Sequence, residues 1–234
     1  MHLYIDNPDG KVQFQFPIEG PLSIALQEIS YIVGYYNITS KKGNNTVQYT
    51  RNEKRSSASL PDGLYIIDAY EQEIRKVVGS GISITPQSFD GKAIVWVKKG
   101  SPPGSFSDQS GVLGFPPEAN VMSGYQQAGT KPVDFLSPKQ LFVHCPQIKG
   151  DENLYNGKPC DILEVLPVTN AKFGHVVTQR IHNPSFKAVA PRSLHELSLH
   201  IKDEEGSDVD FHGQYIRYSL LLRNEHLRTS DRLK

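Results

Sequence analysis

The sequence predicts an all-β fold, a single jelly-roll β-sandwich of about eight main antiparallel strands with one short helix and long loops. Apolar and polar residues alternate along much of the run Leu194–Arg223, which is the period of a strand with one buried face. Gly206 and Gly213 interrupt this alternation, as turns do between antiparallel strands. Several short strands with turn signals and one helical segment favour a sandwich or jelly roll over an α/β fold.

The first forty residues contain two predicted strands. Val12–Phe16 alternates apolar residues with glutamines and is closed by Pro17. Leu22–Val33 is a longer run in which the apolar positions change face after Leu26. We therefore expect either a bulge or a strand buried on both faces. The following segment, Asn37–Ser59, is polar and is expected to turn at residues 41–45.

One segment has the period of a helix. Residues 61–63 form a turn signal, and Leu64–Val78 follows with apolar residues at four-residue spacing. Gly79 and Gly81 then act as stop signals. The apolar positions that define the predicted buried face are Ile66, Tyr70, Ile74 and Val78.

The remaining strands are separated by one long irregular stretch. Lys99–Gln140 has little periodicity and is rich in Gly, Ser and Pro, and such an excursion usually carries contacts or function rather than core. No domain boundary is evident, so we expect one domain over residues 1–223 and a C-terminal tail over residues 224–234. The further predicted strands are Ile82–Thr85, Ala93–Lys98, Gln140–Cys145, Asp161–Val168 and, approximately, His175–Ile181.

Composition excludes several classes of protein. The 234 residues carry 25 basic and 25 acidic side chains, and this neutral balance argues against a dedicated nucleic-acid binder. The mean hydropathy is −0.42, and no apolar run approaches the ~20 residues of a membrane-spanning helix. The N-terminal residues do not resemble an export signal. The two cysteines are therefore expected to be reduced thiols in a protein that is not secreted.

The sequence offers little catalytic chemistry. No phosphate-binding loop, nucleophile elbow, zinc-protease motif or paired cysteine motif occurs. His144 and Cys145, with Cys160, Asp161 and His175, permit a thiol nucleophile with a base. Cys145 shares a strand face with aliphatic residues, which favours a buried structural thiol instead. We expect no enzyme, and predict no catalytic, cofactor-binding or metal-binding residue.

The charged segments and the histidines each permit a structural and a functional interpretation. The acidic run Asp203–Asp210 could coordinate Ca²⁺, but its spacing does not fit an EF-hand and a solvated hairpin turn is favoured. The scattered histidines, among them His182 and His200, show no zinc-site spacing and are assigned to the surface. The mildly basic tail Arg223–Lys234 is either solvated or an extended arm that reaches a neighbouring subunit or packaged nucleic acid.

Several ordered segments together resemble the minor capsid (penton) proteins of Polinton/Maverick elements, adintoviruses, Polinton-like viruses and virophages. Residues 20–31, with Ala-Leu-Gln-Glu-Ile-Ser-Tyr, are similar to an early strand of that family. Glu164 and Leu222 depart from the family pattern, which usually has Arg and Phe there. The other segments are the Leu-Gly-Phe of residues 110–115, the pair of strands 141–150 and 161–168, and the closing segments that begin at His182 and Leu197.

This resemblance implies a single jelly roll that forms a homopentamer at the five-fold vertices of an icosahedral capsid. The implied partners are further copies of the chain, the double-jelly-roll major capsid protein and other capsid components, with no membrane insertion and no expected nucleic-acid contact. The implied location is the virion, after synthesis in the host cytoplasm or nucleus. Sheet edges, the Lys99–Gln140 excursion and both termini would supply the subunit contacts.

Two alternative functions come from different classes. A β-sandwich can instead be a ligand-binding module for carbohydrate or protein, here a domesticated copy of such an element. A Cys-His hydrolase would require a reactive thiol at Cys145 or Cys160.

Overall fold

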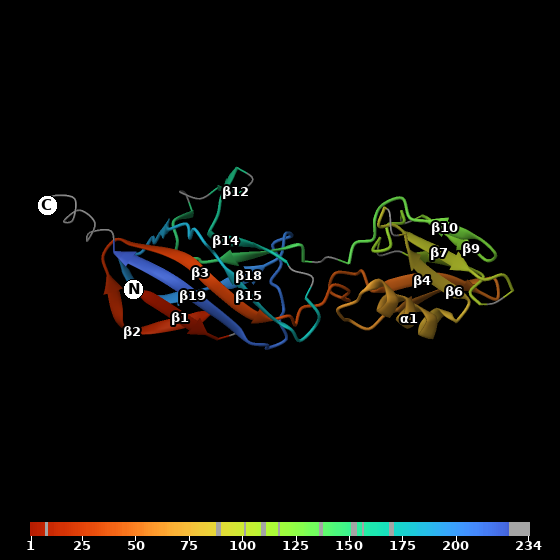
Figure 1. The fold of residues 1–234 in the computed structure, drawn as a ribbon, viewed down its shortest axis with the longest axis horizontal. Coiled ribbons are helices and arrows are strands. Elements are labelled where there is room, and N and C mark those ends of the chain that lie inside the picture. Colours follow the sequence, from red (N-terminus) through yellow and green to blue (C-terminus); the bar gives the residue numbers. More distant parts are fainter. Residues whose placement is uncertain are drawn as a thin grey trace. The chain divides into compact units, whose positions relative to one another are not determined.

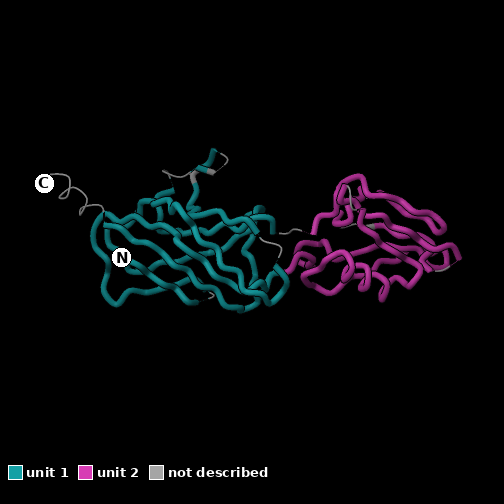
Figure 2. The backbone as a smooth tube through the Cα atoms, viewed as in Figure 1, with its two compact units in different colours: residues 1–35, 138–234 teal, residues 36–137 magenta. Residues whose placement is uncertain are grey.

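The chain folds into two compact units (Figure 2). Unit 1 combines Met1–Tyr35 with Pro138–Lys234, and unit 2 is Tyr36–Ser137. In the sequence, unit 2 is inserted between two segments of unit 1, after Tyr35 and before Pro138. The computed structural model describes residues 1–7, 9–87, 90–100, 102–108, 111–116, 118–135, 138–150, 154–155, 157–168 and 171–224. The predicted tail, apart from Asn224, lies outside these residues.

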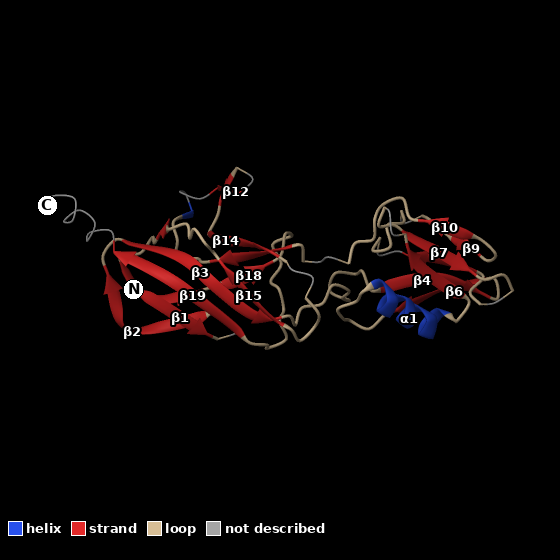
Figure 3. Cartoon of the chain, viewed as in Figure 1, coloured by secondary structure: helices blue, strands red, loops and turns tan. Residues whose placement is uncertain are grey.

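Strands dominate both units, which confirms the predicted all-β class (Figure 3). The structure has more strands than the eight that were expected, because several predicted loops pair into short strands. Among the described residues the one α-helix is α1 (Ile67–Val78), and none is long and apolar enough to cross a bilayer.

The first sheet of unit 1 is built around β3 (Leu22–Ile32) and β19 (Ile216–Asn224) (Figure 1). Their register skips one residue, because Ser219 pairs with Glu28 and Leu220 pairs with Leu26. This bulge on β3 is the phase slip predicted from the sequence, and it lets apolar residues before and after it face the same core. The sheet is completed by β1 (His2–Asp6) beside β19, and by β15 (Val176–Arg180) and β16 (Lys187–Ala188) beside β3.

The remaining strands of unit 1 form smaller ladders. Leu199 alone separates the strand Ser193–Ser198 from the strand His200–Lys202, and its N–H donates to the Gly10 carbonyl. Buried aliphatic residues of these strands and of the first sheet make the core of the sandwich. The ladders are β2 (Lys11–Glu19) with β17 (Ser193–Ser198), β11 (Gln140–His144) between β14 (Ile162–Pro167) and β18 (His200–Lys202), and β12 (Leu154–Tyr155) with β13 (Lys158–Pro159).

Unit 2 consists of two antiparallel sheets and α1. One sheet has the order β5-β4-β8-β9 and the other the order β10-β7-β6. The bounds are β4 (Thr46–Arg51), β5 (Lys54–Ser59), β6 (Ile82–Pro86), β7 (Ala93–Val97), β8 (Ser105–Asp108), β9 (Val121–Met122) and β10 (Gln126–Ala128).

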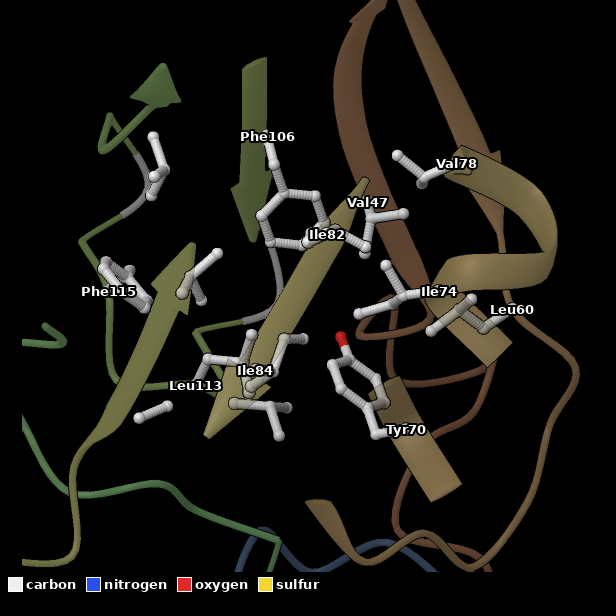
Figure 4. Packing of buried hydrophobic residues seen from close by; sticks show 14 of the residues in the cluster. Val47, Leu60, Tyr70, Ile74, Val78, Ile82, Ile84, Phe106, Leu113 and Phe115 are labelled. Carbon is white, nitrogen blue, oxygen red and sulfur yellow. The ribbon is translucent and has the colours of Figure 1, made fainter. Parts of the chain in front are cut away.

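The core of unit 2 is shared by both sheets and the helix (Figure 4). Tyr70, Ile74 and Val78 point from α1 into a cluster that includes Val47 of β4 and Phe106 of β8. The predicted helix is confirmed, and these three side chains lie on its buried face. Ile66, expected on that face, is instead the residue before the helix and is 67% exposed.

Two predicted loops of unit 2 are ordered strands. The polar segment 37–59 contains the β4–β5 hairpin, whose two-residue turn is Asn52-Glu53 with positive φ at both residues. The 99–140 excursion supplies β8, β9 and β10. Both were missed because their outward-facing positions are polar and their strands are short, so that the apolar alternation is weak.

Candidate interaction surfaces

The predicted thiol constellation is not assembled as a nucleophilic site. Cys145 is buried, and burial raises the pKa of its thiol to about 11. Its Sγ lies 3.6 Å from Oε1 of Gln147, and in the part of the chain that the structure describes neither thiol hydrogen-bonds to an imidazole. A thiol that is protonated at neutral pH and lacks a base is a weak nucleophile. The structural interpretation of Cys145 is the one that this geometry supports.

The neighbouring histidine has a different partner. His144 Nδ1 lies 2.6 Å from Oδ1 of Asp161. His144 also stands directly opposite His200 across the β11–β18 ladder. His200 is half-buried rather than on the surface as expected, whereas His182 is exposed. His175, the other histidine of the predicted thiol constellation, is exposed and directly precedes β15.

The acidic run Asp203–Asp210 forms a turn. Oδ1 of the buried Asp203 accepts backbone N–H bonds from Glu205 and Ser207, at 3.1 and 2.9 Å. A carboxylate used in this way stabilises the turn itself. Across the described ranges no group of three or more His, Cys, Asp or Glu residues could hold a metal ion.

A groove of about 390 Å³ lies beside this turn in unit 1. Ile201 of β18 and Tyr218 of β19 contribute apolar walls, while Lys11 and His200 contribute polar ones. Carboxylates of residues 9, 208 and 210 also line it. The groove therefore carries more acidic than basic groups, and its apolar walls belong to strands that also form the core.

Unit 1 has sheet edges that no other described strand pairs, and exposed aromatic side chains lie on their strands. β1 pairs on one side with β19, and β2 pairs with β17 alone among the described strands. Tyr4 of β1 is 64% exposed and Phe16 of β2 is 75% exposed. An edge strand with exposed apolar side chains readily pairs with another chain unless something covers it.

Unit 2 also exposes large side chains, mostly within the predicted excursion. Trp96 of β7 is 44% exposed, and Met122 and Tyr125 are more exposed still. A second groove, of about 360 Å³, lies on the outer face of the sheet that contains β4 and β8. No local sequence pattern indicates this groove, because its lining comes from three separate segments.

Two Asn-x-Thr sequences of unit 2, at Asn37 and Asn44, have structural roles. Asn37 is 2% exposed, and its Nδ2 donates to the carbonyl oxygens of Tyr65 and Phe135 at 2.7 and 2.8 Å. Nδ2 of Asn44 donates to the Asn37 carbonyl at 2.8 Å. Both amide nitrogens are therefore engaged inside the folded unit.

No protein-family model matches this sequence. No curated protein matches it either. Among solved structures, the chain is similar to the crystal structure of the selenomethionine-labelled mavirus penton protein, with a TM-score of 0.54 and 10% sequence identity. The match covers 95% of this chain and 98% of that chain, so residues of both units take part. At this identity the likeness is one of fold, and it supports the predicted jelly roll.

Proposed function

We propose that this chain is a minor capsid (penton) protein that forms homopentamers at the five-fold vertices of an icosahedral capsid. There it contacts the double-jelly-roll major capsid protein, and its location is the virion. Such a protein acts through contacts with its neighbours in the capsid, and we propose that it has no catalytic activity.

The observation that carries the proposal is the fold similarity to a penton protein over nearly the whole of both chains. The sequence resemblance supports it independently. Its segments at residues 20–31, 141–150 and 161–168 overlap β3, β11 and β14, so they fall on strands of unit 1. Similar residues at structurally central positions are what a shared architecture requires.

We infer that the free edges at β1 and β2 supply contacts between subunits. Burying one Phe side chain contributes about 1.5–3 kcal/mol, and Phe16 is 75% exposed in the single chain. A stable interface buries about 1,000 Å² or more, to which an aromatic edge strand would contribute a central part.

Light scattering after size-exclusion chromatography tests the assembly. The expected particle has a mass of about 130 kDa, five times the 26.1 kDa of one chain, and appears as five-membered rings under the electron microscope. Phe16→Asp should shift it to monomers, whereas Gln15→Asp, which adds the same charge to the neighbouring position, should not. A persistent monomer at the highest soluble concentration, with and without the major capsid protein, would contradict the proposal.

A further inference from the structure

The outer face of the sheet β5-β4-β8-β9 carries an ordered array of polar side chains. Gln48 of β4 pairs in register with Ser57 of β5 and with Ser107 of β8. Two positions along, Thr50 pairs with the residues that continue the array, Arg55 and Ser105. Because alternate residues of a strand point to one face, these six side chains lie on one side. Val47 and Phe106, at the alternate positions, lie in the core.

The floor of the groove is formed by hydroxyl groups that are withdrawn from solvent. Ser105 is 3% exposed and Ser107 is 9% exposed, although both belong to the face opposite the core. Oγ of Ser105 lies 2.8 Å from Oγ1 of Thr50. Glu118 and Asn120, from the segment before β9, line the groove together with these strands. The hollow of about 360 Å³ lies within the range of about 300–1,000 Å³ that is typical of small-ligand sites.

The rim carries polar side chains that the fold itself does not use. Gln48, Arg55 and Glu118 make no hydrogen bond or ion pair with any residue in the described ranges, and all three are exposed. Asn120 has one weak interaction, in which its Nδ2 points at the sulfur of Met122 at 3.6 Å. Arg55 can donate, Glu118 can accept, and the two amides can do both.

We propose that this groove binds a neutral carbohydrate, of the size of one or two sugar units. Sugar hydroxyls both donate and accept hydrogen bonds, as the two amides and the floor hydroxyls do. Tyr49, which alternates with Gln48 and Thr50, packs its ring against the core on the other face, so the side chains of the groove are polar. One cation and one anion at the rim leave the site without net charge, which disfavours a phosphate or a strongly acidic ligand. The polar lining disfavours an apolar one.

The inference goes beyond the proposed capsid role and does not rest on it, because every residue involved lies in unit 2 of a single chain. The proposed binding function belongs to unit 2 and involves no residue of unit 1. A failure of pentamer assembly would leave it unaffected.

Screening of the full-length chain against immobilised oligosaccharides tests the inference. The biotinylated protein is displayed on tetrameric streptavidin, so that a weak site gains avidity, and is applied to an array of neutral and acidic oligosaccharides and of polar peptides. We expect binding to neutral oligosaccharides. Binding to acidic oligosaccharides or peptides alone, or to none of the probes, would overturn the proposal.

Matched variants locate the binding. Arg55→Gln and Glu118→Gln should each weaken it about tenfold or more, the loss of one hydrogen bond to a charged group. Lys54→Gln removes the same charge from the adjacent residue of β5, which points to the other face, and should retain full binding. Gln48→Ala is the substitute if either rim variant melts early, as followed by the fluorescence of Trp96. Equal losses in Lys54→Gln and Arg55→Gln would overturn the assignment.

Discussion

Replacing Asn37 by alanine should destabilise unit 2 severely. This buried side chain joins three segments of the unit, because its Nδ2 donates to the carbonyls of Tyr65 and Phe135 and its Oδ1 accepts from the Tyr65 N–H at 2.7 Å. Alanine removes both donors and the acceptor.

The magnitude follows from the groups that lose their partner. Each buried polar group left unsatisfied costs about 1–3 kcal/mol, and a carbonyl is somewhat less costly than an N–H. One N–H and two carbonyls together give about 4 kcal/mol. A domain of about 100 residues is stable by about 5–15 kcal/mol, so Asn37→Ala should lower the melting temperature of unit 2 by about 15–30 °C.

Tryptophan fluorescence during urea unfolding measures this loss in unit 2 alone, because Trp96, the one tryptophan of the chain, lies in that unit. Asn120→Ala is the matched control, since its exposed amide makes only the weak sulfur interaction. Asn37→Asp keeps the acceptor for the Tyr65 N–H but places a carboxylate oxygen against two carbonyls, and should be at least as damaging. If Asn37→Ala lowers the free energy of unfolding by less than about 1 kcal/mol, which is close to the effect of an ordinary surface substitution, this reasoning is refuted.

Three further predictions concern packing, thiol reactivity and pH. Gly10→Ala should lower the free energy of unfolding, measured by chemical denaturation, by more than about 2 kcal/mol, because the added Cβ would lie 2.2 Å from the Leu199 carbonyl oxygen. Gly43→Ala has open space around it and should lower the free energy of unfolding by about 1 kcal/mol, from its positive φ alone. Equal losses in the two variants would contradict this prediction. In the native protein a thiol reagent at neutral pH should leave Cys145 unmodified, because it is buried and burial raises its thiol pKa to about 11, and rapid labelling of Cys145 in a Cys160→Ser variant would count against it. Burial raises the pKa of Tyr218 well above its ordinary value of about 10, so the folded state keeps that proton longer than the unfolded state does; stability should fall above about pH 10 by about 1.4 kcal/mol per pH unit, and urea midpoints that fall as steeply in Tyr218→Phe would exclude this cause.

Strand and helix identity could be read from local patterns. The alternation in β19 and the four-residue spacing in α1 each report one buried face, and that is a property of a short segment. Even the bulge on β3 was predictable, since the apolar positions change phase within one continuous strand. The β4–β5 hairpin escaped because one of its faces is hydroxyl-rich and the other contributes few apolar residues.

The groove of unit 2 could not be found in this way. Its floor comes from β4 and β8, and its wall from residues 118–120, which are all separated in the sequence. Polar residues on a strand indicate a solvent-facing side, but they do not indicate which other strand adjoins them. For the thiol constellation, local alternation is informative, because Cys145 directly follows His144 of β11 and their side chains point to opposite faces.

The sequence by itself determined the all-β class, the single helix, most strand positions and the absence of recognisable catalytic motifs, because each depends on residues close together in the chain. The tertiary structure decided the division into two units and the pairing of β1 with β19, whose residues are more than 200 positions apart. Alternation fixes the face that a strand buries, whereas the choice of its partner depends on the packing of the whole sheet. The surfaces proposed for assembly and for carbohydrate binding likewise depend on the tertiary structure.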